Sequence, residues 1–283
     1  MNIIEFSNII RNERTASNFI RKQCWKDSIR FCIRCGARRI YKLSTGRYRC
    51  AKCKYTFTDF SGRWIGKLKI DVRQWLWIIK LFELELSARK ISQQVGLSYP
   101  TTLKAVNLIR ETIVTHSSDC RKLFGGEVEA DEAYFGGKRK GPRGRGARNK
   151  IPVFGILERN GRVKVEVVRN VSAESILNLT LKIVRRGSIV YTDKFKSYDS
   201  LMFCGYRHLR VDHAKRFASG KVYINGLEGF WSYAKERLIK HHGVSRRKFP
   251  FYLKEMEFRY NHRNSSLFLH CVDYLCDLVP DLL

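Results

Sequence analysis

The chain has 283 residues, of which 44% are hydrophobic, and its 55 Lys and Arg against 26 Asp and Glu give a formal net charge of +29 at pH 7. This composition predicts a packed protein whose partner is a polyanion, with nucleic acid as the leading candidate, because binding releases the counter-ions condensed on phosphates. No apolar stretch reaches about 18 residues and the N-terminus shows no signal-peptide pattern, so we expect neither a membrane span nor secretion.

A pair of Cys-x2-Cys motifs follows an N-terminal helical segment that we expect over residues 1–30. The motifs are separated by fourteen residues, which is typical of two zinc knuckles joined by a short hairpin, so we predict a structural Zn²⁺ site in a zinc ribbon at residues 31–58. Two disulfides are the alternative, but the cysteine total of nine is odd and no secretion signal is present. The basic, aromatic hairpin between the knuckles can contact DNA or a protein. The predicted zinc ligands are Cys32, Cys35, Cys50 and Cys53.

Helical periodicity comes next, beginning with an expected helix over residues 72–86 that has Asp71 as its N-cap. Apolar residues are then spaced as in the core of a helix-turn-helix, with Gly96 at the turn and Ser98 as the cap of the second helix. We therefore predict a DNA-binding domain at residues 71–118. A plain helical hairpin that supports the next domain is the alternative, because short patterns of this kind also arise by chance. The side chains expected to face a DNA groove are Thr101, Thr102 and Lys104.

From Glu127 onward the sequence alternates between strand and helix patterns. The order predicts an α/β domain at residues 127–245, in which helices cover a sheet. Two further helices are expected to close the chain within residues 246–283 and to pack on this domain. The expected strands are 127–135, 151–158, 162–169 and 188–192, and the expected helices are 172–186, 248–259 and 267–279.

Three acidic residues of this domain lie where a strand ends or a helix begins. Asp131 follows an alternating stretch that places Glu127, Glu129 and Asp131 on one face of a strand, and such crowded charges need a counter-ion. Asp193 ends a later strand, and Glu228 opens an amphipathic helix. Hard carboxylate oxygens from three segments suit Mg²⁺ or Mn²⁺. Each residue also has a structural alternative, such as a turn position for Asp193 or a capping box for Glu228.

Basic residues accompany these carboxylates. Lys235 lies two helical turns after Glu228 on the same helix face, where its ammonium group can reach a phosphate. A glycine-rich basic segment follows the strand of Asp131, and we predict that it contacts the DNA phosphate backbone without reading bases. A solvated charge run or a nuclear-import signal is the alternative. The basic residues of this segment are Lys138, Arg139, Lys140, Arg143, Arg145, Arg148 and Lys150.

Several motifs, taken in order, resemble the DDE transposases of the ISXO-like bacterial insertion sequences and their eukaryotic relatives, the Merlin transposons. The resemblance covers nearly the whole chain, including the ribbon and the helix-turn-helix. It implies an RNase H-like catalytic domain preceded by those two modules, with cut-and-paste chemistry at terminal inverted repeats. The motifs are EADEAYFGGK at 129–138, VFGILER at 153–159, TDKFKSY at 192–198 and NGLEGFWSYAK at 225–235, with His208 and His213 before the last.

On the matching positions, the resemblance implies that Asp131, Asp193 and Glu228 form a DDE triad. Lys235 is then the basic residue that follows it, and His213 is a further candidate, although many histidines only satisfy a local hydrogen bond. Two Mg²⁺ or Mn²⁺ ions held by such a triad can activate water or a DNA 3′-hydroxyl, so that one site both cuts and joins. Two alternatives remain open: a non-catalytic DNA-binding regulator derived from a domesticated transposase, and an RNase H-like structure-specific nuclease.

Double-stranded DNA, as transposon ends and as target, is the expected partner, and no membrane is expected. Because two ends must be brought together, we expect a homodimer or a larger assembly on DNA. The expected location is the nucleus in a eukaryotic host, or the cytoplasm, at the nucleoid, in a bacterial one.

Overall fold

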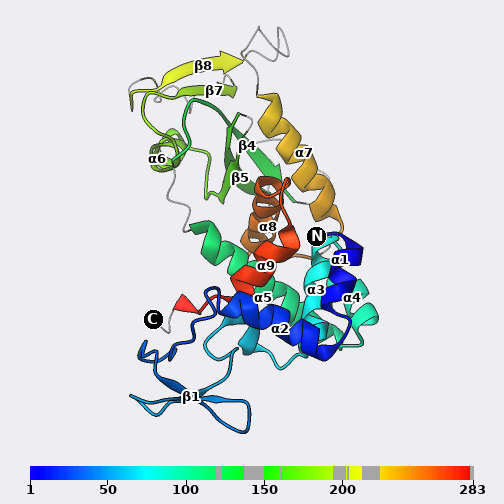
Figure 1. Cartoon of the computed structure of the whole chain (residues 1–283). Helices are drawn as coiled ribbons and strands as arrows, with labels where there is room; N and C mark the ends of the chain where they lie inside the picture. The colour runs from blue at the N-terminus through cyan, green and yellow to red at the C-terminus, as the bar shows by residue number, and fades with distance from the viewer. Residues whose placement is uncertain are drawn as a thin grey trace. The chain divides into compact units, whose positions relative to one another are not determined.

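The chain folds into two compact units (Figure 1). One comprises Met1–His116 with Asn264–Leu283, and the other comprises Ser117–Arg263. Within the described part of the chain, no helix combines the length and the apolar character that a membrane span needs. This computed structural model describes residues 1–118, 123–136, 150–159, 161–193, 202, 204–211, 224–241 and 243–280.

Helices from both ends of the chain build the core of the first unit. The last of them, α9, contacts α2, α3 and the short helix η1, and buries Phe268 and Leu275 completely. We predicted that both C-terminal helices pack on the α/β domain, and for α9 this is wrong. Its apolar face instead meets apolar side chains of the N-terminal helices, among them Phe6, whose ring lies 5.5 Å from that of Phe268. The elements are α1 (Ile3–Ile9), α2 (Glu13–Cys24), η1 (Trp64–Lys67), α3 (Val72–Glu83) and α9 (Leu267–Cys276).

The cysteine motifs lie in a small antiparallel sheet of order β1-β2-β3. Each motif closes a tight turn that ends on a residue with positive φ, Gly36 at 69° in the first turn and Lys54 at 59° in the second. The segment after the second motif contributes β3 and η1. The strands are β1 (Ile40–Lys42), β2 (Tyr48–Cys50) and β3 (Thr56–Phe57).

The helix-turn-helix segment contains two helices, α4 (Ala88–Val95) and α5 (Tyr99–Ser118). Gly96 turns the chain between them with a φ of 68°, and the Ser98 hydroxyl accepts the backbone N–H of Thr101 at 3.4 Å. The predicted turn and cap are thus confirmed. Asp71 caps α3 as expected, by accepting the N–H of Arg73 at 2.8 Å.

A five-stranded sheet of order β6-β5-β4-β7-β8 forms the second unit. β4, β5 and β6 are antiparallel neighbours, whereas β7 pairs parallel with β4 and β8 pairs parallel with β7. This mixed order is the RNase H-like arrangement implied by the resemblance. The strands are β4 (Glu127–Phe135), β5 (Ile151–Glu158), β6 (Val163–Val167), β7 (Ile189–Asp193) and β8 (Arg207–Val211).

Helices cover both faces of this sheet (Figure 1). Because side chains alternate along a strand, Val128 and Ala130 of β4 pack toward α6, whereas Ala133 and Phe135 pack toward α7 and α8. Glu129 and Asp131 therefore share the face that α7 covers, as predicted from the alternating pattern. The helices are α6 (Ala173–Ile183), α7 (Asn225–Ile239) and α8 (Phe249–Asn261).

Side chains of α8 satisfy the outer edge of β6. Asn261 accepts the N–H of Val163 at 2.8 Å, and Glu257 accepts the N–H of Val165 at 2.8 Å. Lys254 donates to the carbonyl of Val165 at 2.7 Å and to Glu257 at 2.8 Å. An edge strand that would otherwise present unpaired backbone groups is thereby closed, which accounts for the burial of Lys254 and Glu257.

Candidate active site and zinc ribbon

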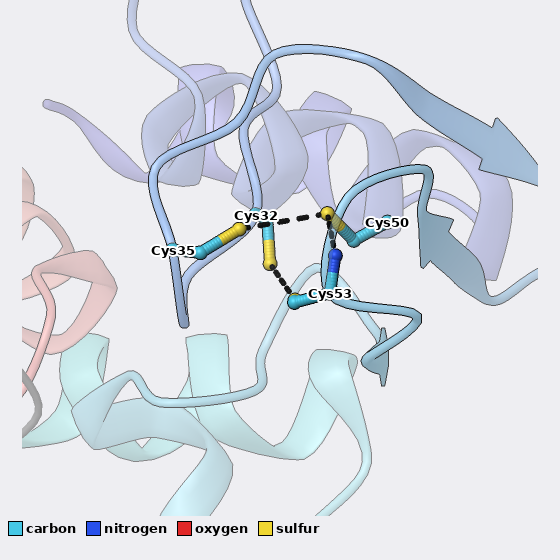
Figure 2. Close-up of side chains that lie close together, drawn as sticks. All are labelled: Cys32, Cys35, Cys50 and Cys53. Atoms are coloured by element: carbon cyan, nitrogen blue, oxygen red, sulfur yellow. Dashed lines mark hydrogen bonds between the residues drawn. The ribbon is translucent and has the colours of Figure 1, made fainter.

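Four cysteine sulfur atoms converge in the ribbon, all within 4.8 Å of one another (Figure 2). The Sγ atoms of Cys32 and Cys53 are 3.5 Å apart, and those of Cys35 and Cys50 are 3.6 Å apart. Tetrahedral Zn²⁺ with Zn–S bonds of about 2.3 Å places its sulfur ligands about 3.8 Å from one another. The four thiols are free rather than paired as disulfides. The arrangement therefore fits one zinc ion, and the predicted ligand set is confirmed as a cluster.

Local hydrogen bonding prepares one of these thiols for metal. The backbone N–H of Cys53 points at the Sγ atom of Cys50 from 3.4 Å. This donor, helped by the backbone N–H of Lys52, lowers the pKa of the Cys50 thiol to about 6. Because zinc binds the thiolate, a lowered pKa favours metal binding at neutral pH.

Asp193 ends β7, whereas Asp131 lies in the middle of the neighbouring parallel strand β4, so the expected strand end at Asp131 is wrong. The register pairs Glu129 of β4 with Tyr191 of β7, and each strand reaches its aspartate two residues later. Burial, together with the negative charges of Glu132 and Asp193, raises the pKa of Asp131 to about 7. Sheet register thus brings together two carboxylates that are 62 positions apart in the sequence (193 − 131).

A neighbouring side chain supports the end of β7. The ring nitrogen Nε2 of His208, on β8, shares a hydrogen bond of 2.7 Å with the hydroxyl of Thr192. Thr192 is fully buried and directly precedes Asp193. His208, noted in the sequence as part of a motif, therefore links β7 and β8 beside the aspartate.

Helix α7 is tied to Asp131 through a tryptophan. The indole N–H of Trp231 donates to the Oδ2 atom of Asp131 at 3.1 Å. Gly155 of β5 pairs with Asp131, and a Cβ atom at this glycine would lie 2.6 Å from the indole ring. A glycine is therefore required for Trp231 to reach the aspartate.

The other two predicted site residues flank Trp231 on α7. Glu228 lies one turn before it, in the first turn of the helix, and is exposed. Lys235 lies about one turn after it, with its ammonium nitrogen 5.8 Å from the ring centre of Phe135, which ends β4. The N-cap of the helix is Ile224, and no side chain caps it, so the capping-box interpretation of Glu228 is wrong.

The three carboxylates are not gathered around a single point. Within the described ranges, the four cysteines form the one group of three or more potential ligands close enough to hold an ion. The structure brings Asp131 and Asp193 together and places Glu228 on the helix that is hydrogen-bonded to Asp131.

The other acidic residues of β4 have a counter-ion within the protein. The Arg159 guanidinium lies 2.5 Å from a carboxylate oxygen of Glu127 and 3.3 Å from one of Glu129. It also stacks over the ring of Tyr191 at 3.7 Å. The sequence analysis missed Arg159, although its place directly after β5, the antiparallel neighbour of β4, was a usable signal. Of the crowded acids predicted to need a cation, two therefore already have one.

The three side chains of the helix-turn-helix that were predicted to contact DNA differ in their exposure. Thr102 is fully buried, with its hydroxyl donating to the carbonyl of Ser98 at 3.1 Å, so its assignment to a groove is wrong. Thr101 is half-buried, and its hydroxyl shares a hydrogen bond of 2.9 Å with that of Ser98. Lys104 is exposed.

Most of the predicted basic segment lies outside the residues that the structure describes. Lys150 is half-buried, and its carbonyl accepts a hydrogen bond from Arg246 at 3.2 Å. The remaining candidates lie outside the described residues; they are Lys138, Arg139, Lys140, Arg143, Arg145, Arg148 and His213.

Two solved structures show a weak likeness to the chain. A crystal structure of the Mos1 strand transfer complex has 14% identity and a TM-score of 0.31, covering 69% of this chain and 73% of that one. A Mos1 mariner paired end complex with Mn has 13% identity and a TM-score of 0.31, covering 70% and 74%. Similarity at this level adds nothing to what the sheet order shows by itself.

Family models and relatives match most of the chain. An ISXO2-like transposase domain matches residues 123–261, and a transposase zinc-ribbon domain matches residues 11–56. An uncharacterized transposase-like protein of Haemophilus influenzae is 42% identical over 100 residues, which are 35% of this chain and 81% of that protein. An uncharacterized protein in transposable element ISH50 of Halobacterium salinarum is 28% identical over 273 residues, covering 88% and 90%. With the cysteine cluster and the sheet order, these matches show that the chain belongs to the ISXO-like family of DDE transposases.

Proposed function

We propose that the protein catalyses metal-dependent DNA strand cleavage and strand transfer at the terminal inverted repeats of a transposon. The observation that carries this proposal is the pair of neighbouring carboxylates on β4 and β7, Asp131 in the middle of its strand and Asp193 at the end of its own. Burial and nearby negative charge raise the pKa of Asp131 to about 7, so its ionised form is unfavourable unless a cation lies beside it. A divalent ion is the partner that such a pair fits.

The donor set also agrees with the proposed metal. Asp131, Asp193 and Glu228 offer only carboxylate oxygens, which suit Mg²⁺ or Mn²⁺. Two such ions, when bound, supply Lewis-acid stabilisation of phosphate charge and lower the pKa of an attacking water or 3′-hydroxyl. The protein orients these oxygens, through the indole of Trp231 at Asp131 and through the sheet register at Asp193.

Lys235 is proposed to hold a phosphate beside the carboxylates. Its ammonium group lies near Phe135, at the end of the strand that carries Asp131. A fixed positive charge there stabilises negative charge on the DNA strand during transfer. Its position two turns from Glu228 keeps the cation and the metal-binding carboxylate on one side of α7.

The zinc ribbon is a second proposed DNA contact. Residues 28–58 hold nine Lys and Arg and no acidic residue. The exposed face of its sheet carries Tyr41 paired with Arg49, while the neighbouring Tyr48 and Cys50 are buried. A basic surface with an exposed aromatic ring suits the phosphate backbone of DNA. Because two transposon ends must meet, we also expect a homodimer or larger on DNA, which sizing with and without end DNA would test.

The decisive experiment uses DNA from the flanks of the reading frame. Wild type should cleave end DNA in Mg²⁺ and join a pre-cleaved 3′-hydroxyl end to a target plasmid, whereas Asp193→Ala should bind the DNA equally and do neither. Glu174→Ala is the control, because Glu174 is an exposed carboxylate on α6, across the sheet. Cleavage by Asp193→Ala would overturn the assignment. Cutting without joining by wild type would indicate a nuclease, and binding alone would indicate a regulator.

A further inference from the structure

Glu129 is a buried acidic residue that the proposed chemistry does not use. It lies on β4 two residues before Asp131, on the same sheet face, and only 1% of it is exposed. One carboxylate oxygen accepts the backbone N–H of Leu227 at 2.8 Å, and the other accepts the Nε–H of Arg159 at 3.3 Å. Glu129 therefore joins the strand of Asp131 to the first turn of the helix that carries Glu228.

Helix α7 needs a partner of this kind at its N-terminus. The first backbone N–H groups of a helix have no acceptor within the helix, and a side chain at the N-cap usually supplies one. The N-cap here is Ile224, and no side chain caps it. A carboxylate is also favoured by the positive end of the helix dipole. Glu129 thus provides from β4 what a capping side chain would provide locally.

A glycine makes this contact possible. A Cβ atom at Gly226 would lie 2.9 Å from the Oε2 atom of Glu129, which is closer than real Cβ contacts allow. Any larger residue at this position would push the carboxylate away from the N–H of Leu227. The contact between Glu129 and α7 therefore depends on both partners, and each can be altered separately.

We infer that Glu129 is a positioning residue, which fixes the first turn of α7 against β4 and so sets where Glu228 lies relative to Asp131. The second tie, from Trp231 to Asp131, acts one turn further along the helix. Arg159 holds Glu129 in place from the opposite side. This inference rests on the proposed function, because it assigns Glu129 a part in building the same metal site. Its measurable consequence is the affinity of that site for divalent ions.

The test compares Glu129→Ala, Glu129→Gln and Gly226→Ala in the zinc-loaded protein. Mn²⁺ affinity by calorimetry and the Mg²⁺ concentration for half-maximal cleavage are the two measurements. Glu129→Ala and Gly226→Ala should each lower the Mn²⁺ affinity, and raise the Mg²⁺ concentration for half-maximal cleavage, by about tenfold or more. This is the usual effect of losing a group that orients a metal ligand. Glu129→Gln should stay within about threefold of wild type, because its amide oxygen still accepts the N–H of Leu227.

Glu257→Ala is the matched control. Glu257 is also a buried carboxylate, 4% exposed, that accepts a backbone N–H at 2.8 Å, but it does so at the edge of the sheet. The Glu257→Ala substitution should lower the melting temperature without changing the Mn²⁺ affinity.

Three outcomes would overturn the inference: unchanged Mn²⁺ affinity in Glu129→Ala and Gly226→Ala, an equal loss in Glu257→Ala, or a loss in Glu129→Gln as large as in Glu129→Ala. The last would show that the charge itself binds metal. Mn²⁺ binding without any cleavage by wild type would instead count against the proposed function, while leaving the positioning role to be judged by affinity.

Discussion

The zinc ribbon and the carboxylate site are built in opposite ways. The four sulfur ligands come from one short stretch, residues 32–53, and lie within 4.8 Å of one another. The three carboxylates come from positions 131, 193 and 228 on two strands and a helix, and in the part of the chain that the structure describes they form no such group. A site made by adjacent turns forms when those turns fold. A site made by three distant elements depends on sheet register and on how the helix is attached.

This difference agrees with the role that we propose for each site. Four thiolates close the coordination sphere of a structural zinc ion, so tight convergence is an advantage. A site for phosphoryl transfer must leave coordination positions for water and phosphate. In the site that we propose, neighbouring groups hold the structure in place, with Trp231 bonded to Asp131 and Glu129 bonded to the start of α7.

Removing zinc should have the largest effect. It should unfold the ribbon and leave the sheet of the second unit folded. The ribbon has three strands of at most three residues each, too little to stay folded alone, and thiolate sites of this kind bind zinc with about 10 to 16 kcal/mol. We expect Cys50→Ser or chelation to expose the amides of the ribbon to hydrogen exchange while those of β4 stay protected. Equal protection of the ribbon with and without zinc would show that the metal is not what holds it together.

Replacing Glu228 should affect chemistry alone. Glu228→Ala is expected to lower the cleavage rate by at least about 10³-fold, or about 4 kcal/mol, because it removes one metal-binding carboxylate. Melting temperature and DNA affinity should not change, since the side chain is exposed. Glu236→Ala is the control, an exposed carboxylate on the same helix, and it should cleave like wild type. Equal rates in both variants would remove Glu228 from the site.

Gly155→Ala tests whether the helix must approach the sheet this closely. The new Cβ atom would meet the Trp231 ring at 2.6 Å, and we expect a loss of about 2 to 3 kcal/mol in the free energy of unfolding. Gly229→Ala is the matched control, because its Cβ atom meets nothing within 4 Å, and it should stabilise α7 by up to about 1 kcal/mol. Urea unfolding measures both. A harmless Gly155→Ala would show that Trp231 can reach Asp131 in other ways.

The sequence predicted the bounds of strands, which depend on local pattern. It did not predict the burial and the ion pairs that depend on which helices and strands contact one another. The predicted strand bounds 127–135 and 151–158 match β4 and β5, because polar–apolar alternation and turn residues are local features of the sequence. The burial of Thr102 was missed, since the inward face of a helix is set by its neighbours. Arg159 was missed for a similar reason, because its partners lie on another strand. For the proposed active site, the sequence supplied the candidate residues, but it did not predict the contacts that Asp131 makes with Trp231 and that Glu129 makes with α7.

The last expected effect is a pH dependence of stability that comes from Asp131. Since the folded-state pKa of Asp131 is raised to about 7, the metal-free folded protein holds a proton that the unfolded chain releases near pH 4. Its contribution to stability is therefore complete below about pH 4 and is lost as the pH rises through about 7. Asp131→Asn, which cannot ionise, should become more stable relative to wild type as the pH rises across that window. Mg²⁺ should reverse the order by stabilising wild type alone. Melting temperatures of the two proteins at each pH, with and without Mg²⁺, give this difference, and a constant difference would mean that Asp131 ionises as freely as an exposed aspartate.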